Sequence, residues 1–292
     1  MIKIKARSIV VYQTLVAIFL FLLLLIIMIP FWRVVVAAFT PLDVYTREGV
    51  PFFLPLKDWT VETFKQLMSH TQFGRAAYNS FIITASGTAL SLTLTVPLAY
   101  TLSNRRLPGR KIIMFLVLFT FLFSPGLVPT YLVVTGLNLN NSYWAIILPP
   151  AVSVYNTLVM TSFFEGIPED LKEAARLDGA SEFKILWDVI LPLSKPILLT
   201  IGLFYAVHFW NEFFTPILYL NDNNLLPLPV LLRNILISAQ FNEYVEFDAF
   251  STSSMESLKS AGVLITMIPM LIIYPWIQRY FTRGTLLGGV KE

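Results

Sequence analysis

The chain has 292 residues, of which 56% are hydrophobic and 13% are charged, and it contains no cysteine. About 25% charged residues is usual in soluble domains, so this composition excludes an ordinary soluble protein and favours a membrane protein. Without cysteine, disulfides and thiolate chemistry are excluded. A formal net charge of +3 gives no reason to expect nucleic-acid binding, since basic residues in membrane proteins mainly set topology.

Long apolar runs predict membrane spans, because a helix needs about 20 apolar residues to cross a bilayer. The first run follows Lys3, Lys5 and Arg7 and is too long for a secretory signal peptide, so we expect it to be retained. The six predicted spans are residues 10–36, 79–102, 112–134, 143–164, 196–220 and 261–281. We expect residues 1–292 to form a single all-α transmembrane domain.

Basic residues in the short loops predict the orientation of these spans. Those between the second and third spans are Arg105, Arg106, Arg110 and Lys111, whereas residues 135–142 carry no charge. Positively charged loops stay in the cytoplasm, so both termini are expected on the cytoplasmic side of a bacterial inner membrane. Residues 38–78 and 221–260 then face outward, where they either contact an external partner or cap the bundle. The first of these segments is expected to hold a short helix.

The loop between the fourth and fifth spans, residues 165–192, carries much of the charge of the chain. Pro168 followed by Glu169 and Asp170 is typical of a helix start, and Gly179 is typical of a helix stop. A second helix is predicted after this stop. Its expected apolar stripe consists of Phe183, Leu186, Trp187 and Ile190. The loop therefore predicts a cytoplasmic helix, a turn and a second helix.

This loop resembles the EAA loop of ATP-binding-cassette importer permeases. The resemblance rests on Glu173-Ala174-Ala175, on Gly179 six positions after the glutamate, and on Leu191-Pro192. Val189 stands where the family pattern has isoleucine, and Asp178-Gly179-Ala180 resembles the form in carbohydrate importers. The resemblance implies that Glu173 anchors the helix on a nucleotide-binding subunit and that Gly179 permits the turn. The ATPase-coupling residues it implies are Glu173, Ala174, Ala175, Asp178 and Gly179.

Further matches extend the resemblance over most of the chain, toward maltose-type permeases and their oligosaccharide, alginate-like subgroup. They are Asn79-Ser80, the run from Arg106 to Arg110, Trp210-Asn211-Glu212-Phe213 with Pro216, and the tail from Gly284 to Lys291. The resemblance implies a six-span type I importer bundle with a coupling-helix loop. It also implies a second homologous permease subunit, two cytoplasmic ATP-binding subunits that bind ATP and Mg, and an extracytoplasmic solute-binding protein as partners.

Polar residues inside the predicted spans are the candidates for the translocation path, because charge there is costly. His208 and Glu212 are four residues apart, so we expect them to share a helix face, where they could pair. Asn156, Tyr205 and Asn211 complete the candidate set. A structural lock between helices explains the same residues equally well, and the two interpretations stay open here. The only two histidines are far apart in the chain, so no metal site is expected.

The sequence has no Gly-Lys-Ser/Thr phosphate-binding loop and no catalytic constellation, so we expect a transport subunit and not an enzyme. The expected function is ATP-driven import of a carbohydrate, with an acidic, alginate-like oligosaccharide as the most specific version. A transporter driven by an ion gradient through Glu212 and His208 is the first alternative. A membrane enzyme acting on lipid-linked sugars is the second.

Overall fold

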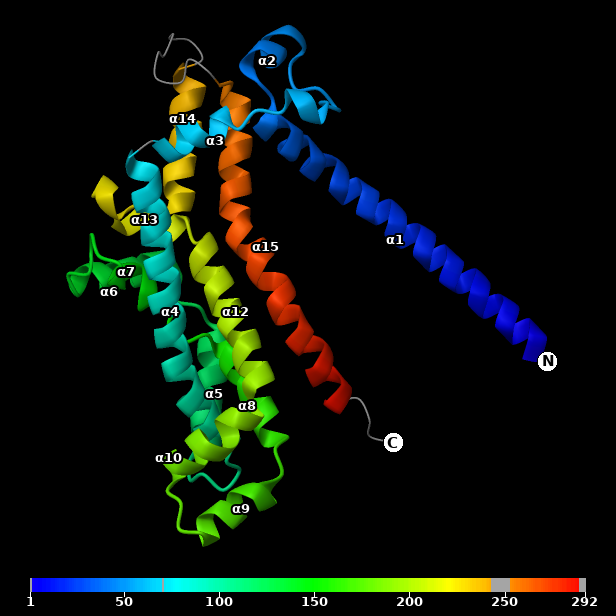
Figure 1. Ribbon diagram of the computed structural model, residues 1–292. Helices are drawn as coiled ribbons and strands as arrows, with labels where there is room; N and C mark the ends of the chain where they lie inside the picture. Colours follow the sequence, from blue (N-terminus) through cyan, green and yellow to red (C-terminus); the bar gives the residue numbers. More distant parts are fainter. Residues whose placement is uncertain (1, 70, 243–252, 289–292) are drawn as a thin grey trace. The chain divides into compact units, whose positions relative to one another are not determined.

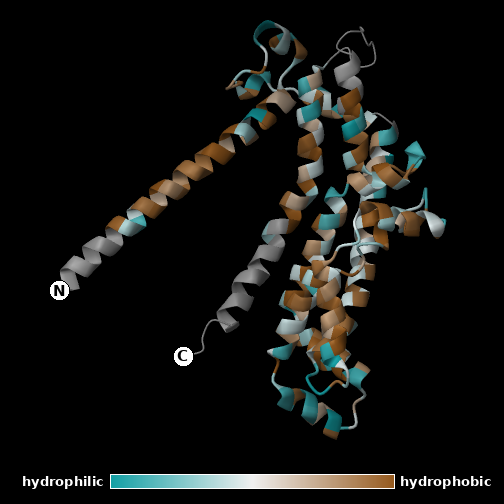
Figure 2. Ribbon diagram, turned by 180° about the vertical axis from the view of Figure 1, so that it is seen from behind, coloured by the Kyte–Doolittle hydropathy of each residue, from teal (hydrophilic) through white to brown (hydrophobic). Residues whose placement is uncertain are grey.

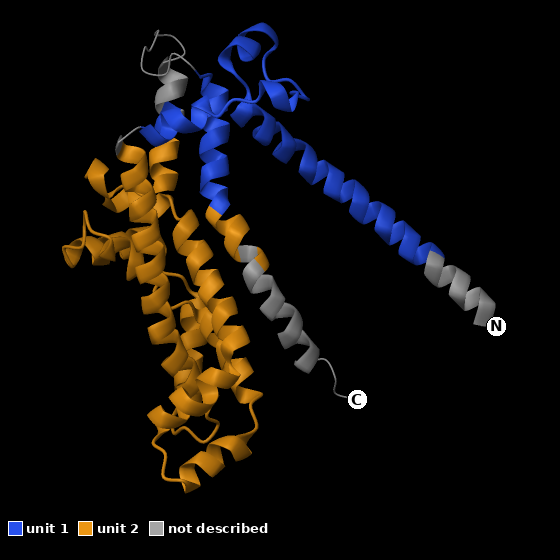
Figure 3. Cartoon of the chain, in the orientation of Figure 1, with its two compact units in different colours: residues 1–71, 234–268 blue, residues 72–233, 269–292 orange. Residues whose placement is uncertain are grey.

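The computed structural model describes residues 2–69, 71–242 and 253–288. All regular structure in these ranges is helical, which confirms the predicted all-α class. The chain divides into two compact units, residues 1–71 with 234–268 and residues 72–233 with 269–292 (Figure 3). The sequence had suggested a single domain. Residues 243–252 and 289–292, which include parts of the second outward segment and of the tail, lie outside the described residues.

Unit 1 begins with α1 (Ile2–Phe39), which contains the first predicted span (Figure 1). Its side chains from residue 11 to residue 29 are all exposed, and in Figure 2 most of the ribbon of α1 in this stretch has the hydrophobic colour. A helix that is apolar all round is stable only in lipid or against other helices. α1 ends where Pro41 follows Thr40, whose hydroxyl donates to the Val36 carbonyl at 2.7 Å.

The short helix expected after the first span is present as three short helices. They are α2 (Leu42–Glu48), the 3-10 helix η1 (Leu56–Asp58) and α3 (Glu62–Ser69). The Trp32 indole donates to the Phe52 carbonyl at 2.9 Å, and the Trp59 ring stacks on Phe39 with centroids 4.6 Å apart. These contacts fold the segment back onto the end of α1.

The core of unit 2 lies between α4 (Thr71–Ser103), α8 (Val154–Glu165) and α12 (Lys195–Asn211). Ile83, Phe164 and Tyr205 are buried there, one from each helix. α4 and α12 pack so closely that a Cβ at Gly87 would lie 2.7 Å from the Phe209 ring. Glycine at position 87 therefore permits this helix pair. α14 (Leu228–Asn242) and α15 (Met255–Gly288) each continue from one unit into the other.

The predicted span at residues 112–134 is not one straight helix. It is divided into α5 (Arg110–Leu122) and α6 (Leu127–Gly136), which are bent by 110°. Pro125 lies between them and has no N–H for the helix ladder, and Gly126 has a left-handed φ of 82°. Proline and glycine together explain why the helix breaks here.

The predicted spans at residues 143–164 and 196–220 are also interrupted. α7 (Trp144–Ile147) is separated from α8 by a turn that contains Pro149-Pro150. α12 ends at Asn211, and α13 (Phe214–Tyr219) follows after Glu212 adopts an extended backbone. Hydropathy alone recognised each stretch as apolar but did not reveal where the backbone leaves the helix.

Three helices of the described chain are long and apolar enough to cross a membrane: Val11–Phe39, Gln72–Ser103 and Met255–Ile273. The number rises to five if each of two bent helix pairs forms one span, namely α5 with α6 and the segment Glu182–Leu193 with α12. Span six of the sequence corresponds to α15, and span two to α4. The count of six spans stays a prediction.

Candidate functional site

α9 (Glu169–Leu177) forms the first half of the charged loop and lies at one end of unit 2 (Figure 1). Glu169 and Asp170 occupy its first turn and Arg176 its last, an order that matches the helix dipole. Gly179 follows with a left-handed φ of 80°. Its N–H donates to the Arg176 carbonyl and the N–H of Ala180 to the Ala175 carbonyl, both at 3.0 Å. This bonding pattern is a Schellman motif, so Gly179 ends the helix as predicted.

One side of α9 is open to solvent. Glu173 and Ala174 are exposed, and Leu177 is 89% exposed, while Ala175 packs against the core of unit 2. Figure 2 shows hydrophilic residues gathered at this end of the unit. A short helix with a glutamate and small residues outward is free to approach another protein surface closely.

Arginines of the turn between α4 and α5, and of the first turn of α5, form ion pairs with glutamates at the base of this loop. Arg106 pairs with Glu173 at 3.2 Å. Arg105 reaches Glu165 at 3.7 Å, and Arg110 pairs with the same carboxylate. The two cytoplasmic loops predicted from charge are therefore in contact within unit 2, which the sequence did not indicate.

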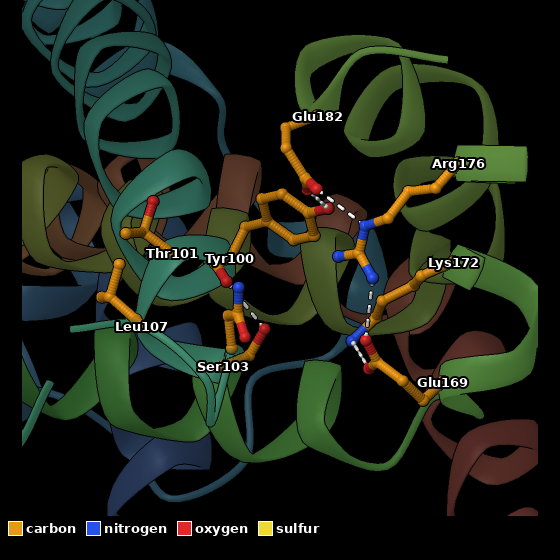
Figure 4. Close-up of a pocket in the computed structure, with 9 residues that line it drawn as sticks. Tyr100, Thr101, Ser103, Leu107, Glu169, Lys172, Arg176 and Glu182 are labelled. Carbon is orange, nitrogen blue, oxygen red and sulfur yellow. Dashed lines mark hydrogen bonds and ion pairs between the residues drawn. The ribbon is translucent and has the colours of Figure 1, made fainter. Parts of the chain in front are cut away.

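A second polar cluster links α9 to its neighbours around a cavity of about 220 Å³ (Figure 4). Arg176 contacts Glu169 at 3.2 Å and Glu182 at 2.8 Å. The Tyr100 hydroxyl donates to Glu182 at 2.6 Å, and Lys172 pairs with Glu169 at 3.1 Å. Burial alone would raise the pKa of Glu169, but the hydrogen bonds from Lys172 and Arg176 outweigh it and hold that pKa below its ordinary value.

Sequence reasoning missed this cluster. Glu169 and Arg176 are seven residues apart, which puts them on one face of a helix, and that spacing was the available signal. The pairing of Tyr100 with Glu182 joins positions 82 residues apart, and no local pattern predicts it.

The second half of the loop differs from its prediction. It consists of α10 (Glu182–Ile185), the π-helix η2 (Leu186–Ile190) and α11 (Leu191–Leu193). Leu186 and Ile190 are buried as expected, but Phe183 and Trp187 are 73% and 62% exposed and stack on each other. A π-helix winds more residues into each turn than an α-helix, so the expected stripe divides between two faces.

Asn156, Tyr205 and His208 meet on a cavity of about 880 Å³ between α8 and α12. The Tyr205 hydroxyl is bonded to Thr95 at 2.7 Å and accepts from the Ser153 N–H at 2.9 Å. Tyr205 and Asn156 are both buried, whereas His208 is exposed. The hydrogen bonds of Tyr205 thus hold its side chain in the cavity wall, while the exposed His208 side chain is accessible from the cavity.

The expected pairing of His208 with Glu212 is wrong. α12 ends at Asn211, so Glu212 lies beyond the helix. His208 and Glu212 both line a cavity of about 270 Å³, but no ion pair joins them among the described residues. The Glu212 carboxylate instead accepts from the N–H groups of Phe214 at 3.1 Å and Thr215 at 2.9 Å. It caps α13. The Asn211 amide bonds back to the Val207 carbonyl at 2.9 Å.

The pair Asn79-Ser80 has a structural role in unit 2. The Asn79 amide donates to the carbonyls of Asn224 at 2.8 Å and Leu226 at 3.0 Å, and the Ser80 hydroxyl accepts from the Leu228 N–H at 2.8 Å. These bonds fasten the segment before α14 onto α4.

Long apolar helices, breaks beside cavities and a charged helix at one end define a membrane transport subunit.

Comparison with known proteins specifies the family. Residues 91–286 match the model of the binding-protein-dependent transport system inner membrane component. The chain is 40% identical over 275 residues to a polygalacturonan/rhamnogalacturonan transport system permease protein of Bacillus subtilis, covering 94% of this chain and 96% of that protein. The chain therefore belongs to this family of importer permeases, as the EAA resemblance implied, and it is a transport subunit and not an enzyme.

Solved structures agree. A bacterial ABC transporter involved in the import of the acidic polysaccharide alginate has a chain that is 31% identical, with a TM-score of 0.87 over 94% of this chain and 98% of that one. A chain of the bacterial alginate ABC transporter in complex with alginate pentasaccharide-bound periplasmic protein has a TM-score of 0.59 at 15% identity, covering 96% of each chain. The second likeness concerns the fold alone.

Proposed function

We propose that this chain is a transmembrane subunit of an ATP-driven, binding-protein-dependent oligosaccharide importer, and that α9 is the helix on which a nucleotide-binding subunit docks. The observation that carries the proposal is the geometry of α9. Its Schellman end and the pairing with Arg106 hold Glu173 and Ala174 in an exposed position. Ala175 and Asp178 complete the docking set, Ala175 through packing and Asp178 by ending the helix before Gly179.

Energy must come from another subunit, because the sequence has no phosphate-binding loop. We therefore assign ATP and Mg to two cytoplasmic ATP-binding subunits. ATP binding closes that pair, and the docked α9 helices carry the closure into the membrane domain. Alternating access requires that ATP stabilise one state of the domain more than the other, since a ligand of equal affinity shifts no equilibrium.

A second permease subunit and an external binding protein complete the assembly. The exposed apolar surface of α1 supports contact with lipid and with a homologous partner subunit. The bacterial alginate transporter of similar fold forms a complex with a periplasmic protein that carries an alginate pentasaccharide. The loop charges support both termini in the cytoplasm, which places residues 38–78 and 221–260 on the side of such a binding protein.

We assign Asn156 and His208 to the translocation path, where they line the same cavity with the aromatic Tyr155 and Phe204. Aromatic and amide groups together suit a sugar ring, which offers an apolar face and hydroxyl edges. We assign a role in shaping the walls of the path to Tyr205, Asn211 and Glu212, because their polar groups form hydrogen bonds within the protein. The cavity lining contains no lysine or arginine among the described residues.

The substrate is proposed to be an acidic oligosaccharide of the uronate kind. Two relatives of this chain are named for polygalacturonan/rhamnogalacturonan and for the acidic polysaccharide alginate. His208 and donors from the partner permease would then meet the carboxylates. Uptake into vesicles tests this step. Unlabelled oligogalacturonate should compete with labelled substrate, whereas a neutral maltooligosaccharide of equal length should not, and equal competition would contradict the acidic assignment.

Docking is tested by co-purification from membranes that contain all subunits. Glu173→Lys reverses the charge presented by α9, so the ATP-binding subunits should be lost from the purified complex. Glu48→Lys is the matched control, because Glu48 is an exposed glutamate of α2 in the segment assigned to the other side of the membrane. Retention of the ATP-binding subunits and of uptake in Glu173→Lys would overturn the proposal.

A further inference from the structure

We propose that Arg176 is a positioning residue that makes α9 and α10 move as one body when an ATP-binding subunit displaces α9. This inference rests on the docking role proposed for α9. It concerns a different step, namely how displacement of the docked helix reaches the membrane domain instead of being absorbed by the turn that follows α9.

The turn is a natural hinge. The backbone between α9 and α10 consists of residues 178–181, and Gly179 within them has a left-handed φ of 80°. A Cβ placed on Gly179 would meet no atom within 4 Å, so no neighbouring side chain packs against this position. Glycine has more backbone freedom than any other residue, so packing at position 179 itself does not fix the angle between α9 and α10, although Ala175 and Ala180 on either side pack against the core.

Arg176 spans this hinge. Its Nη1 contacts Glu169 at the start of α9, and its Nε contacts Glu182 at the start of α10, at 3.2 and 2.8 Å. Figure 4 shows the guanidinium between the two carboxylates. A planar guanidinium presents donors in a rigid fork, so two carboxylates held at once are fixed in direction as well as in distance.

Tyr100 extends the link to α4. Its hydroxyl donates to Oε2 of Glu182 at 2.6 Å, while Arg176 holds Oε1 of the same carboxylate. Lys172, whose side chain is 5% exposed, fixes the other end by pairing with Glu169. The chain of contacts therefore runs from α9 through α10 to α4, one of the long apolar helices of unit 2.

These pairs are not expected to hold the fold together. The side chains of Glu169, Arg176 and Glu182 are 45%, 31% and 57% exposed, and exposed ion pairs contribute little to stability. These ion pairs instead fix the direction of α9 relative to α10. Their role in coupling can therefore be tested without unfolding the subunit. Arg176→Gln should leave the subunit folded and assembled while α9 loses its direct link to Glu182 across Gly179.

The functional test compares complexes that carry Arg176→Gln or Lys184→Gln with wild type. Lys184 is the matched control, because it is an exposed basic residue of α10 outside the ion pairs found in the described part of the chain. We expect Arg176→Gln to retain the ATP-binding subunits and ATP hydrolysis, but to transport less substrate per ATP hydrolysed than wild type. Arg176→Lys, which keeps the charge but loses the fork, should be intermediate. An unchanged ratio in Arg176→Gln would overturn the proposal.

A second readout measures the link directly. The chain has no cysteine, so Leu177→Cys on α9 and Leu94→Cys on α4 give a single pair of spin labels when the partner subunits are cysteine-free. The doubly labelled subunit with Arg176 intact should show one narrow distribution of distances between the two labels, and ATP should not broaden it. The same subunit with Arg176→Gln should show a broader distribution. Equal widths in the two proteins would overturn the link. If the ATP-binding subunits fail to co-purify with the subunit in which Arg176 is intact, the docking role of α9 is contradicted instead.

Discussion

Glu212 shows how one side chain sets the local course of the backbone. Its carboxylate accepts from two N–H groups at the start of α13, which would otherwise lack partners after the break that ends α12. A carboxylate at a helix start also matches the positive end of the helix dipole. The acidic residue in this apolar region is thus explained by the backbone.

Glu212→Ala should lower the free energy of unfolding of the subunit in detergent by about 1 kcal/mol, the usual effect of losing a helix cap. Glu212→Gln keeps an oxygen acceptor and should lose less, with uptake retained. Asn211→Ala is the control, since that amide bonds to the Val207 carbonyl of its own helix. Abolished uptake in a stable Glu212→Gln would instead support the proton relay of a gradient-driven transporter.

The side-chain contacts explain which residue predictions succeeded. Gly179 was predictable because a helix stop is a local signal, and the structure gives it the left-handed φ that the signal implies. The pairing of His208 with Glu212 failed because it assumed that the helix continues through residue 212, whereas α12 ends at Asn211. Arg106 and Glu173 are 67 residues apart in sequence, and only the folded chain brings them together.

At the scale of elements, the turn after α9 requires a left-handed backbone conformation at Gly179. Gly179→Val should weaken the docking of ATP-binding subunits, because a β-branched residue with a left-handed φ costs about 1–2 kcal/mol. The matched control is Gly136→Val at the end of α6, where a new side chain also meets open space but φ is not positive. Co-purification measures both variants. Equal retention of the partner subunits in both would contradict a role for the turn.

Helical breaks are the elements that sequence reasoning located least well. The apolar runs at residues 112–134, 143–164 and 196–220 were recognised, and their prolines were visible. A proline can produce either a kink in a continuous helix or a complete break, so composition does not show which of the two occurs. The bend of 110° between α5 and α6 depends on the glycine conformation at position 126 as well.

At the scale of the molecule, composition and hydropathy sufficed for the class. A chain with 13% charged residues and long apolar runs forms an all-helical membrane protein, and the family match agrees. The division into two units was not predictable, because each unit joins segments distant in sequence. The charged loop remained the strongest signal, since a solvated charged helix is conspicuous in an apolar chain.

The most direct measurement of the central claim is photo-crosslinking in the assembled importer. A photoreactive amino acid replaces Leu177, which is 89% exposed on α9, or Leu137, which is 63% exposed in the uncharged loop assigned to the opposite side of the membrane. We predict a crosslink from position 177 to an ATP-binding subunit and none from position 137. Absence of that crosslink from position 177, or equal crosslinking from both positions, would contradict the account.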